Sequence, residues 1–351
     1  MLNVTPAGWA VTLTLLGALF GLDLVRTARR PHAVSFHEAL FWSLFYIAVA
    51  LAFGGVFGLL AGWDLAAQYF AGYLVEKSLS VDNLFVFLII MSTFAVPAEQ
   101  QARALTIGIV AALVLRAIFI AAGAALLEAF SVMFLIFGLA LILTAIQLFR
   151  HRNEDPSVED NVLVSVARRV LPLTSDYDGP KLMTRSDGLP VLTPLFLVLV
   201  AIGSTDLLFA LDSIPAVFGV AQHAYIVFVA NAFALLGLRA LFFLVAGMLD
   251  RLVYLSAGLS LILAFIGVKL ILHFLHLRDD AVPEISTGVS LGVIVVVLAC
   301  TTSASLLKAR RSALRAHAGR LREPRCAARW RALFPCGQVP TVADTRTEHE
   351  D

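Results

Sequence analysis

The sequence predicts an all-α, polytopic membrane protein with about nine transmembrane helices, and three observations lead to this fold class. Hydrophobic residues make up 60% of the 351 residues and charged residues only 15%. The mean hydropathy is +0.88, whereas a soluble domain is about 45–50% apolar and about 25% charged. Finally, the apolar residues gather in runs of about 20, the length that crosses a bilayer. A soluble enzyme of this length could not bury so much apolar surface.

Nine apolar runs have the length of a membrane-spanning helix. They lie at about 8–25, 38–60, 65–91, 103–127, 130–149, 191–219, 224–247, 254–276 and 286–307. The first run holds Asp23 near its end and has no small-residue cleavage site after it. We therefore expect a retained helix and not a signal peptide.

The basic residues predict the orientation, because Lys and Arg prefer cytoplasmic loops. They follow the odd-numbered runs: Arg26, Arg29, Arg30, Arg103, Arg150, Arg152, Arg168, Arg169, Lys181, Arg185, Arg251 and nine residues of 308–331. The opposite loops hold one basic residue, Arg278. This pattern predicts an N-terminus outside and a C-terminus in the cytoplasm.

The runs divide the chain into six parts. These are two N-terminal helices (1–60), a three-helix unit (61–149), a cytoplasmic loop (150–190), a second three-helix unit (191–276), a ninth helix (277–307) and a basic cytoplasmic tail (308–351). The loop is expected to be a solvated linker, or to hold an amphipathic helix at 158–170 followed by a short hairpin. The tail is expected to be disordered.

Several function classes lack support in the sequence. The net charge of +1 gives nucleic acid no basic surface. The three cysteines, Cys300, Cys326 and Cys336, have no CxxC or other ligand spacing. Glycine-rich phosphate loops, nucleophile elbows and HExxH are absent, so neither an enzyme nor a tightly bound cofactor is expected.

Two segments of the chain repeat one motif. Residues 76–84 read EKSLSVDNL and residues 206–214 read DLLFALDSI. The next helix of each half also repeats, with LVLRAIF at 113–119 and LGLRALF at 236–242. We predict that helices 3–5 and 6–8 are inverted three-helix repeats, an arrangement typical of transporters.

The repeated motif places four acids near the membrane centre: Glu76, Asp82, Asp206 and Asp212. Each would cost on the order of 2.5–3.5 kcal/mol if unpaired. A bound cation, protons, or the basic residues Lys77, Arg116 and Arg239 must therefore compensate these charges.

Residues at i, i+4 and i+7 share one face of a helix. Two polar stripes are expected, formed by Glu76, Ser80 and Asn83 and by Asp206, Ala210 and Ser213. Asp82 and Asp212 point about 120° away from these stripes. They could join the same cluster if a helix unwinds, which Pro215 favours in the sixth helix.

The candidate ligands are carboxylate, amide and hydroxyl oxygens, which suit Mg²⁺, Ca²⁺ or Mn²⁺. We predict a cation pathway with the metal ligands Glu76, Asp82, Asn83, Asp206, Asp212 and Ser213. Gating or charge compensation is assigned to Lys77, Arg116 and Arg239. The alternative is that these acids and bases form purely structural ion pairs.

The basic residues carry more detailed expectations. Lys77 should face away from the Glu76 stripe or pair with an acid of the other repeat. Arg116 and Arg239 occupy matching positions, and each should hold a carboxylate or carbonyls, because arginine stays charged and binds bidentately.

A few further polar residues lie near helix ends. Asp23 is expected to form a surface ion pair with Arg26, and Lys269 to snorkel or to pair internally. Three histidines are expected at the membrane interface: His223, His273 and His276. The alternative is that they form an external metal gate.

The motifs at 76–87 and 205–216 resemble the signatures of the TerC integral membrane family, which includes the bacterial Alx proteins and belongs with the LysE-type transporters. The likeness covers nearly all of residues 20–307. It implies a bacterial inner-membrane protein of metal homeostasis, in a family associated with Mn²⁺ export and tellurite resistance. Many members carry a Glu shortly before the second motif, where this chain has Gly203.

The expected function is export of a divalent cation, with Mn²⁺ preferred over Ca²⁺ or Mg²⁺. The expected partners are the lipid bilayer, metal ions and possible cytoplasmic proteins bound through 150–190 and 308–351. The alternative is a membrane scaffold of a tellurite-resistance or stress-response complex that transports nothing. A membrane redox enzyme is a third possibility, for which the sequence offers no cofactor ligands.

Overall fold

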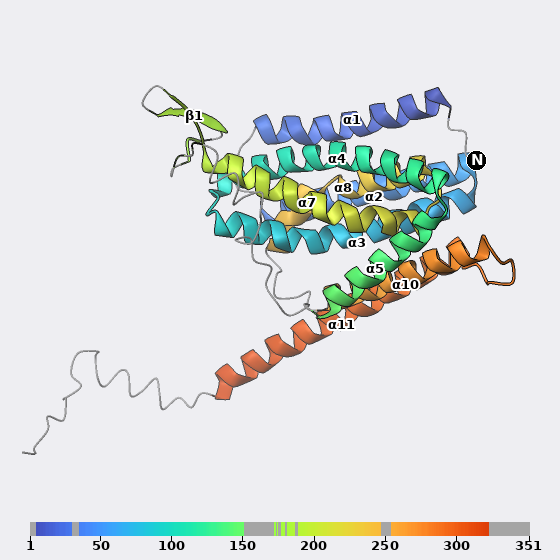
Figure 1. Cartoon of the computed structure of the whole chain (residues 1–351). Helices are drawn as coiled ribbons and strands as arrows, with labels where there is room; N and C mark the ends of the chain where they lie inside the picture. Colours follow the sequence, from blue (N-terminus) through green and yellow to red (C-terminus); the bar gives the residue numbers. More distant parts are fainter. Residues whose placement is uncertain are drawn as a thin grey trace, which may run out of the picture. The chain divides into compact units, whose positions relative to one another are not determined.

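The computed structural model of the chain is built from α-helices, with one short β-hairpin among its described residues (Figure 1). It describes residues 5–29, 35–150, 172, 174, 177–179, 181–186, 189–246 and 254–322. The chain divides into two compact units, residues 1–305 and 306–351. The first unit contains the hairpin and nearly all the helices. The predicted all-α membrane fold is confirmed.

The helices are α1 (Pro6–Arg29), α2 (Phe36–Ala61), α3 (Trp63–Thr93), α4 (Ala98–Ala129), α5 (Val132–Arg150), α7 (Pro194–Phe218), α8 (Ala224–Leu235), α9 (Leu238–Ala246), α10 (Leu255–His276) and α11 (Thr287–Arg322). Seven of the described helices are long and apolar enough to cross a membrane: α1, α2, α4, α5, α7, α10 and α11. Helices α8 and α9 would make an eighth span if counted together.

Helix α3 accounts for the difference from the nine predicted spans. It has 31 residues, about 46 Å at 1.5 Å per residue, which is ample for a bilayer. It also carries Asp64, Glu76, Lys77 and Asp82, so its apolar stretches are interrupted by charge. The span predicted at 65–91 is therefore present as a long helix, but its charged residues set it apart from the seven uninterrupted apolar helices.

The helical break lies in the second half of the chain, but not where it was expected. Pro215 lies inside α7, which stays helical to Phe218, so the predicted unwinding at this proline is wrong. A proline removes a single backbone donor, and the helix ends within one turn of it. The chain breaks instead between α8 and α9, where Gly237 has φ 75° and the helix axes bend by 44°.

Helix α3 packs against α2, α7 and α8, and α4 packs against α7. The most extensive pair is α5 with α10, which lie side by side in Figure 1. Their backbones approach at Gly138 and Gly267, where a Cβ on either glycine would lie 2.8 Å from the other's carbonyl oxygen. Only glycine permits this approach.

The hairpin consists of β1 (Met183–Ser186) and β2 (Leu189–Leu192), which pair antiparallel with Ser186 opposite Leu189. It confirms the hairpin expected in the loop, whereas the amphipathic helix expected at 158–170 lies outside the described residues. Hydrogen bonds from Thr184 and Lys181, together with the Lys181 charge, hold the pKa of the Asp178 carboxyl below its usual range.

The last helix is longer than the sequence indicated. Helix α11 continues to Arg322, so the tail predicted to be disordered from residue 308 begins as helix. Twelve of the fifteen residues at 308–322 are Ala, Leu, Lys or Arg, which explains the extension because these residues have high helix propensity. The other proposed part boundaries stay predictions.

The glycine contact between α5 and α10 is testable. Replacing Gly138 with Ala should force the backbones apart and lower the Tm of the purified protein by roughly 2–10 °C. Gly203 is the control, because a Cβ there would meet nothing within 4 Å. Gly203→Ala should keep or raise the Tm, and equal effects of the two substitutions would contradict the close approach.

Candidate functional site

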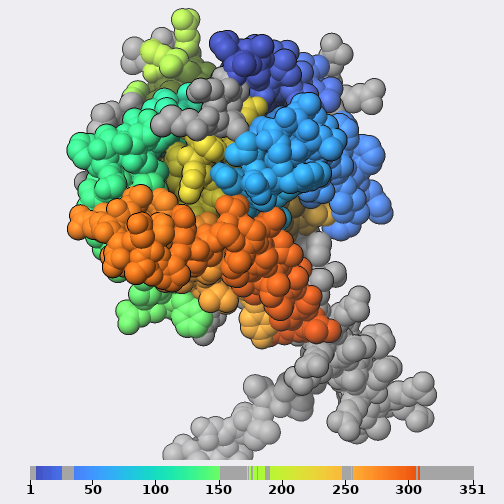
Figure 2. All heavy atoms as spheres, turned by 90° about the vertical axis from the view of Figure 1, so that its right-hand side faces the viewer, coloured from blue at the N-terminus to red at the C-terminus, as the bar shows by residue number. Residues whose placement is uncertain are grey.

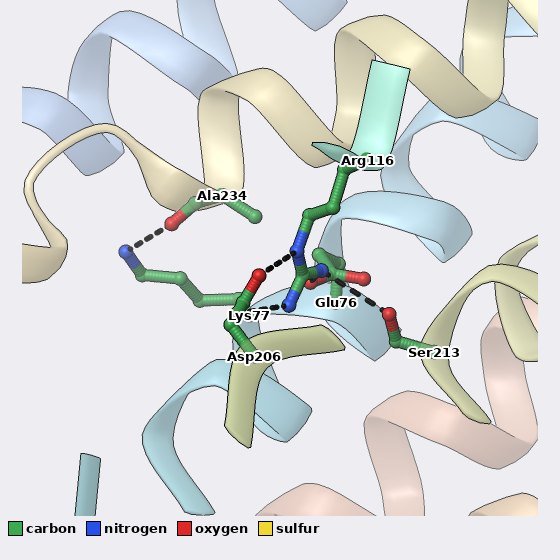
Figure 3. Close-up of polar contacts among 6 residues, drawn as sticks. All are labelled: Glu76, Lys77, Arg116, Asp206, Ser213 and Ala234. Atoms are coloured by element: carbon green, nitrogen blue, oxygen red, sulfur yellow. Dashed lines mark hydrogen bonds and ion pairs between the residues drawn. The ribbon is translucent and has the colours of Figure 1, made fainter. Parts of the chain in front are cut away.

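The candidate site is a buried cluster around the guanidinium of Arg116, which α4 contributes (Figure 3). Arg116 Nη2 donates to Asp206 Oδ1 at 3.0 Å, and Nε donates to Asp206 Oδ2 at 3.4 Å. Nη1 donates to Ser213 Oγ at 3.1 Å and also to Glu76 Oε1. Arg116 is 1% exposed and Glu76 is 0% exposed, so the neighbouring helices exclude water from these charges.

The predicted stripes explain why these groups meet. Glu76, Ser80 and Asn83 are all buried on α3, as are Asp206, Ala210 and Ser213 on α7. The shared faces are therefore confirmed. Gly72, one turn before Glu76, lets α3 approach α7 closely, because its Cβ would lie 3.1 Å from Val217 Cγ1. The Arg116 side chain extends from α4 into this contact between α3 and α7.

The cluster has unequal charges. Two carboxylates face one guanidinium, which leaves one negative charge uncompensated if all three groups are ionised. A buried ion pair gives a protein little more stability than apolar residues of similar size would give in its place. Removing one partner, however, lowers the stability strongly, because the other charge is then buried without a partner. The bidentate contact with Asp206 fixes the guanidinium plane, because the planar donors of arginine match the two oxygens of a carboxylate.

Asp82 and Asp212 do not join this cluster, contrary to the convergence considered from the sequence. Both helices remain regular, so the six-residue spacing keeps these acids on another face. Ser256 Oγ of α10 donates to Asp82 Oδ1 at 2.9 Å, and Thr144 Oγ1 of α5 donates to Asp212 Oδ1 at 3.0 Å. Each contact joins the first helix of one predicted unit to the last helix of the other.

Lys77 faces away from the Glu76 stripe, as expected. Its Nζ donates to the carbonyl oxygen of Ala234 at 3.0 Å (Figure 3). It also donates to the carbonyl oxygen of Leu236 at 3.5 Å. These carbonyls lie at the break between α8 and α9, where helical hydrogen bonding stops. Lys77 therefore pairs with carbonyl dipoles and not with an acid of the other half.

Arg239 holds a carboxylate too, but at a different place. Its Nη2 donates to Asp23 Oδ1 at 2.7 Å, and Tyr46 Oη donates to the same oxygen at 3.2 Å. Both side chains are less than one-fifth exposed, so this contact does not lie at the surface, whereas the expected pair of Asp23 with Arg26 stays a prediction. The side chain of Arg26 lies outside the described residues.

Lys269 and His273 line a cavity of about 280 Å³ where α5, α7, α10 and α11 approach one another. Figure 2 shows the yellow segment after α7 recessed between green and orange elements there. Lys269 Nζ donates to Ser290 Oγ at 2.9 Å, so this lysine is internally paired. His273 contacts Glu284, His276 contacts the Val282 carbonyl, and His223 precedes α8.

The described residues contain no group of three or more His, Cys, Asp or Glu side chains placed to hold a metal. Arg116 lies between the two carboxylates that would be the best pair of ligands. The arrangement brings three predicted ligands together, Glu76, Asp206 and Ser213, and leaves Asp82 and Asp212 apart.

Three polar residues escaped the sequence analysis. Thr144 and Ser256 bind the two separate acids, and Asn231 of α8 is 1% exposed with both side-chain polar atoms unpaired among the described residues. A lone amide inside the apolar run at 224–235 was the available signal for Asn231. Single hydroxyls on apolar helices carry no comparable signal, because serine and threonine often bond to their own backbone.

Comparison with known proteins places the chain among membrane proteins. Residues 61–313 match the family described as Integral membrane protein TerC family. An uncharacterized membrane protein of Mycobacterium tuberculosis is 45% identical over 317 residues, covering 86% of this chain and 79% of the relative. No solved structure matches the chain.

Two relatives have more informative names. An Escherichia coli protein named Alx, described as a proposed membrane-bound redox modulator, is 38% identical over 307 residues, covering 85% of this chain and 93% of its own. The chloroplastic thylakoid membrane protein TERC of Arabidopsis thaliana is 42% identical over 260 residues, covering 74% and 66%.

The Arg116 cluster makes a stability prediction. Arg116→Gln should leave two buried carboxylates uncompensated and cost about 3–5 kcal/mol, which thermal unfolding in detergent would register as a large Tm loss. Adding Asp206→Asn should restore part of the Tm. Lys181→Gln is the control, since it removes an exposed ion pair, and exposed pairs contribute little to stability. A double variant no more stable than the single one would contradict this charge balance.

Lys77 makes a separate prediction. Lys77→Met should leave the Ala234 and Leu236 carbonyls without their donor and speed amide hydrogen exchange around residues 235–240. Because Lys77 points away from Glu76, Mn²⁺ affinity measured by isothermal titration should stay within about threefold, a change of under 1 kcal/mol. A tenfold loss of affinity would show that the lysine supports the acidic site.

Proposed function

The chain belongs to the TerC family of integral membrane proteins, and from this premise we propose that it exports a divalent metal cation, with Mn²⁺ as the cargo. The proposal places it in metal homeostasis, in a bacterial inner membrane, with the N-terminus outside and the C-terminus in the cytoplasm. The basic loops identified in the sequence support this orientation.

The observation that carries the proposal is the cluster of Glu76, Asp206 and Ser213 around one guanidinium. Oxygen ligands from two helices surround a positive group at the middle of the membrane-spanning segments. Intramembrane acids are costly and typically mark ion pathways. A divalent cation would balance the two carboxylates by itself if Arg116 withdrew.

We propose that Arg116 and the cargo occupy this place alternately. With the cation absent, the guanidinium neutralises the acids and closes the pathway. When a cation binds Glu76 and Asp206, Arg116 moves aside, and one side of the pathway opens. Arg239, held by Asp23 beside the α8–α9 break, is the proposed second gating arginine.

Asp82 and Asp212 are the proposed flanking ligands, one on each side of the centre, with Asn83 beside the first. Their matched contacts to Ser256 and Thr144 support the proposal of two inverted repeats. The reciprocal glycine contact between α5 and α10 supports it as well. In an inverted-repeat transporter, rocking of one repeat against the other alternates access to a fixed central site.

A second candidate, redox modulation, comes from the description of the Escherichia coli relative. Cys300 is a free and exposed cysteine of the described residues, and Cys326 and Cys336 lie outside them. A scaffold without transport, acting in tellurite resistance or stress, is the other alternative. Both alternatives leave the buried acids a purely structural role.

Cellular metal content tests the proposal. Cells that express Glu76→Gln, Asp82→Ala, Asp206→Asn or Asp212→Ala should accumulate Mn²⁺ relative to cells with the wild-type protein, because the export pathway loses a ligand. The measurement is elemental analysis of washed cells at equal membrane abundance of each variant.

Asp178→Asn is the matched control, because it neutralises an acid that precedes the β1–β2 hairpin and lies outside the helices. It should leave Mn²⁺ at the wild-type level. Unchanged Mn²⁺ in all four acid variants, with correct insertion, would reject export and favour the scaffold.

A further inference from the structure

The cavity lined by Lys269 and His273 lies at one end of the contact between α5 and α7. Along this contact, Asp212 of α7 accepts a hydrogen bond from Thr144 of α5. Gly219, in the cavity wall, follows Asp212 by seven residues. The two positions share one face of the helix and lie about 10 Å apart. The cavity therefore lies in line with Asp212, toward the end of α7.

The cavity has room for a hydrated cation. Its volume is about 280 Å³, whereas a divalent cation with about six waters fills roughly 180 Å³ at about 30 Å³ per water. In the orientation proposed above, α7 and α10 both end on the outer side of the membrane. This orientation puts the cavity between Asp212, a proposed ligand, and the outside.

The loop between α10 and α11 contributes residues 284–286 to the cavity wall. Figure 1 shows this loop in orange beyond the end of α10. Two histidines of α10 hold it. His273 Nδ1 lies 2.8 Å from Glu284 Oε1, and His276 Nδ1 lies 2.7 Å from the carbonyl oxygen of Val282.

The loop and the start of α11 are attached to α10 in different ways. Lys269 Nζ donates to Ser290 Oγ, and Ser290 is 0% exposed, so the first turn of α11 is fixed to α10. Among the described residues, the two histidine contacts are the only side-chain hydrogen bonds between residues 280–285 and α10. Phe134 of α5 packs against the His273 ring, with 4.8 Å between the ring centroids. The loop can therefore detach while the helices around it stay in place.

Protonation of His273 determines the strength of its contact with Glu284. A protonated imidazole and a carboxylate form an ion pair, whereas a neutral imidazole donates a single, weaker hydrogen bond. Histidine changes its charge between about pH 5 and pH 8. The contact is therefore strong in acid and weak in base. The second histidine contact depends less on pH, because a carbonyl accepts from a neutral imidazole as well.

Few other ionisable groups surround His273. The stretches of the neighbouring helices at 132–142 of α5, 213–222 of α7 and 287–297 of α11 contain none. The helix α10 and the loop supply the rest: Lys269, His276, Arg278, Asp279, Asp280 and Glu284. Of these, Lys269 and Glu284 line the cavity with His273, and the Lys269 ammonium is already bound to a hydroxyl.

We infer that residues 277–286 form a pH-sensitive lid on the outer end of the cation pathway, latched by His273 and Glu284. The lid is closed when His273 is protonated and opens when this histidine is neutral. The inference rests on the proposed function and deepens it, because it names how export through the same pathway is regulated. Acid outside the cell then slows the release of the cation.

The first test measures Mn²⁺ release from loaded, right-side-out membrane vesicles that contain the full-length protein. The wild-type protein should release Mn²⁺ about threefold faster at an external pH of about 8 than at about 5.5, because the latch weakens as histidine loses its proton. Glu284→Gln, which removes the ion pair, should be fast at both pH values. His273→Lys, which keeps a positive charge beside Glu284, should be slow at both.

His37→Gln is the matched control, because His37 is an exposed histidine at the start of α2 and does not line the cavity. This variant should keep the pH dependence of the wild-type protein. All variants experience the same proton gradient, so the differences among them report the latch. If Glu284→Gln and His273→Lys change the release in the same direction, the pair has a structural role and the inference is overturned.

A second measurement does not depend on transport. Amide hydrogen exchange of the purified, metal-free protein reports the opening of residues 278–286, after correction for the intrinsic pH dependence of exchange. The wild-type loop should exchange several-fold faster at the alkaline pH than at the acid pH. In Glu284→Gln the loop should exchange fast at both. His273→Gln also lacks the ion pair and replaces this variant if Glu284→Gln does not fold.

The two measurements separate failure of the lid from failure of the proposed function. Equal pH dependence of loop exchange in the wild-type protein and in the variant without the ion pair would overturn the lid. If the loop opens with pH as expected but vesicles with the wild-type protein release no Mn²⁺ at either pH, the latch holds and the proposed export fails.

Discussion

Arg116 is the interaction on which the interior of this helix bundle depends. Its guanidinium binds acids of α3 and α7 and a hydroxyl of α7 while its own backbone belongs to α4. Three helices from both halves of the chain are thereby tied at one buried point. Because charges at this depth cannot be solvated, the helices cannot separate there without a replacement for the guanidinium. In the transport mechanism that we propose, opening of the centre is coupled to the arrival of another positive charge.

The second feature of the interior is that the four acids have different partners. Glu76 and Asp206 share the arginine, whereas Asp82 and Asp212 each bind a single hydroxyl from a helix of the other half. Each hydroxyl contact is a single hydrogen bond, whereas Arg116 makes one ionic contact with Glu76 and a bidentate one with Asp206. The bundle thus has one firmly held polar centre and two weakly held polar positions beside it.

Much of this arrangement could be predicted from the sequence, because helical periodicity determines which residues share a face. The stripe of Glu76, Ser80 and Asn83 and the burial of Asp206 and Ser213 follow directly from i, i+4 and i+7 spacing. Contacts between helices do not follow from periodicity. Asp23 meets Arg239, 216 residues away, and nothing in the local pattern distinguishes this partner from Arg26. The break at Gly237 was similarly hidden, since proline gave the stronger local signal and glycine tolerates both conformations.

The contact between Asp23 and Arg239 limits how far the protein can be truncated from its N-terminus. The match to the TerC family begins at residue 61, so the matched segment does not include α1 and α2. Yet Asp23 of α1 and Tyr46 of α2 meet at Arg239, deep in the matched region. In a fragment that starts at residue 61, Arg239 would lose the Asp23 carboxylate inside the bilayer. The interactions that hold the bundle together therefore extend beyond the segment that the family match covers.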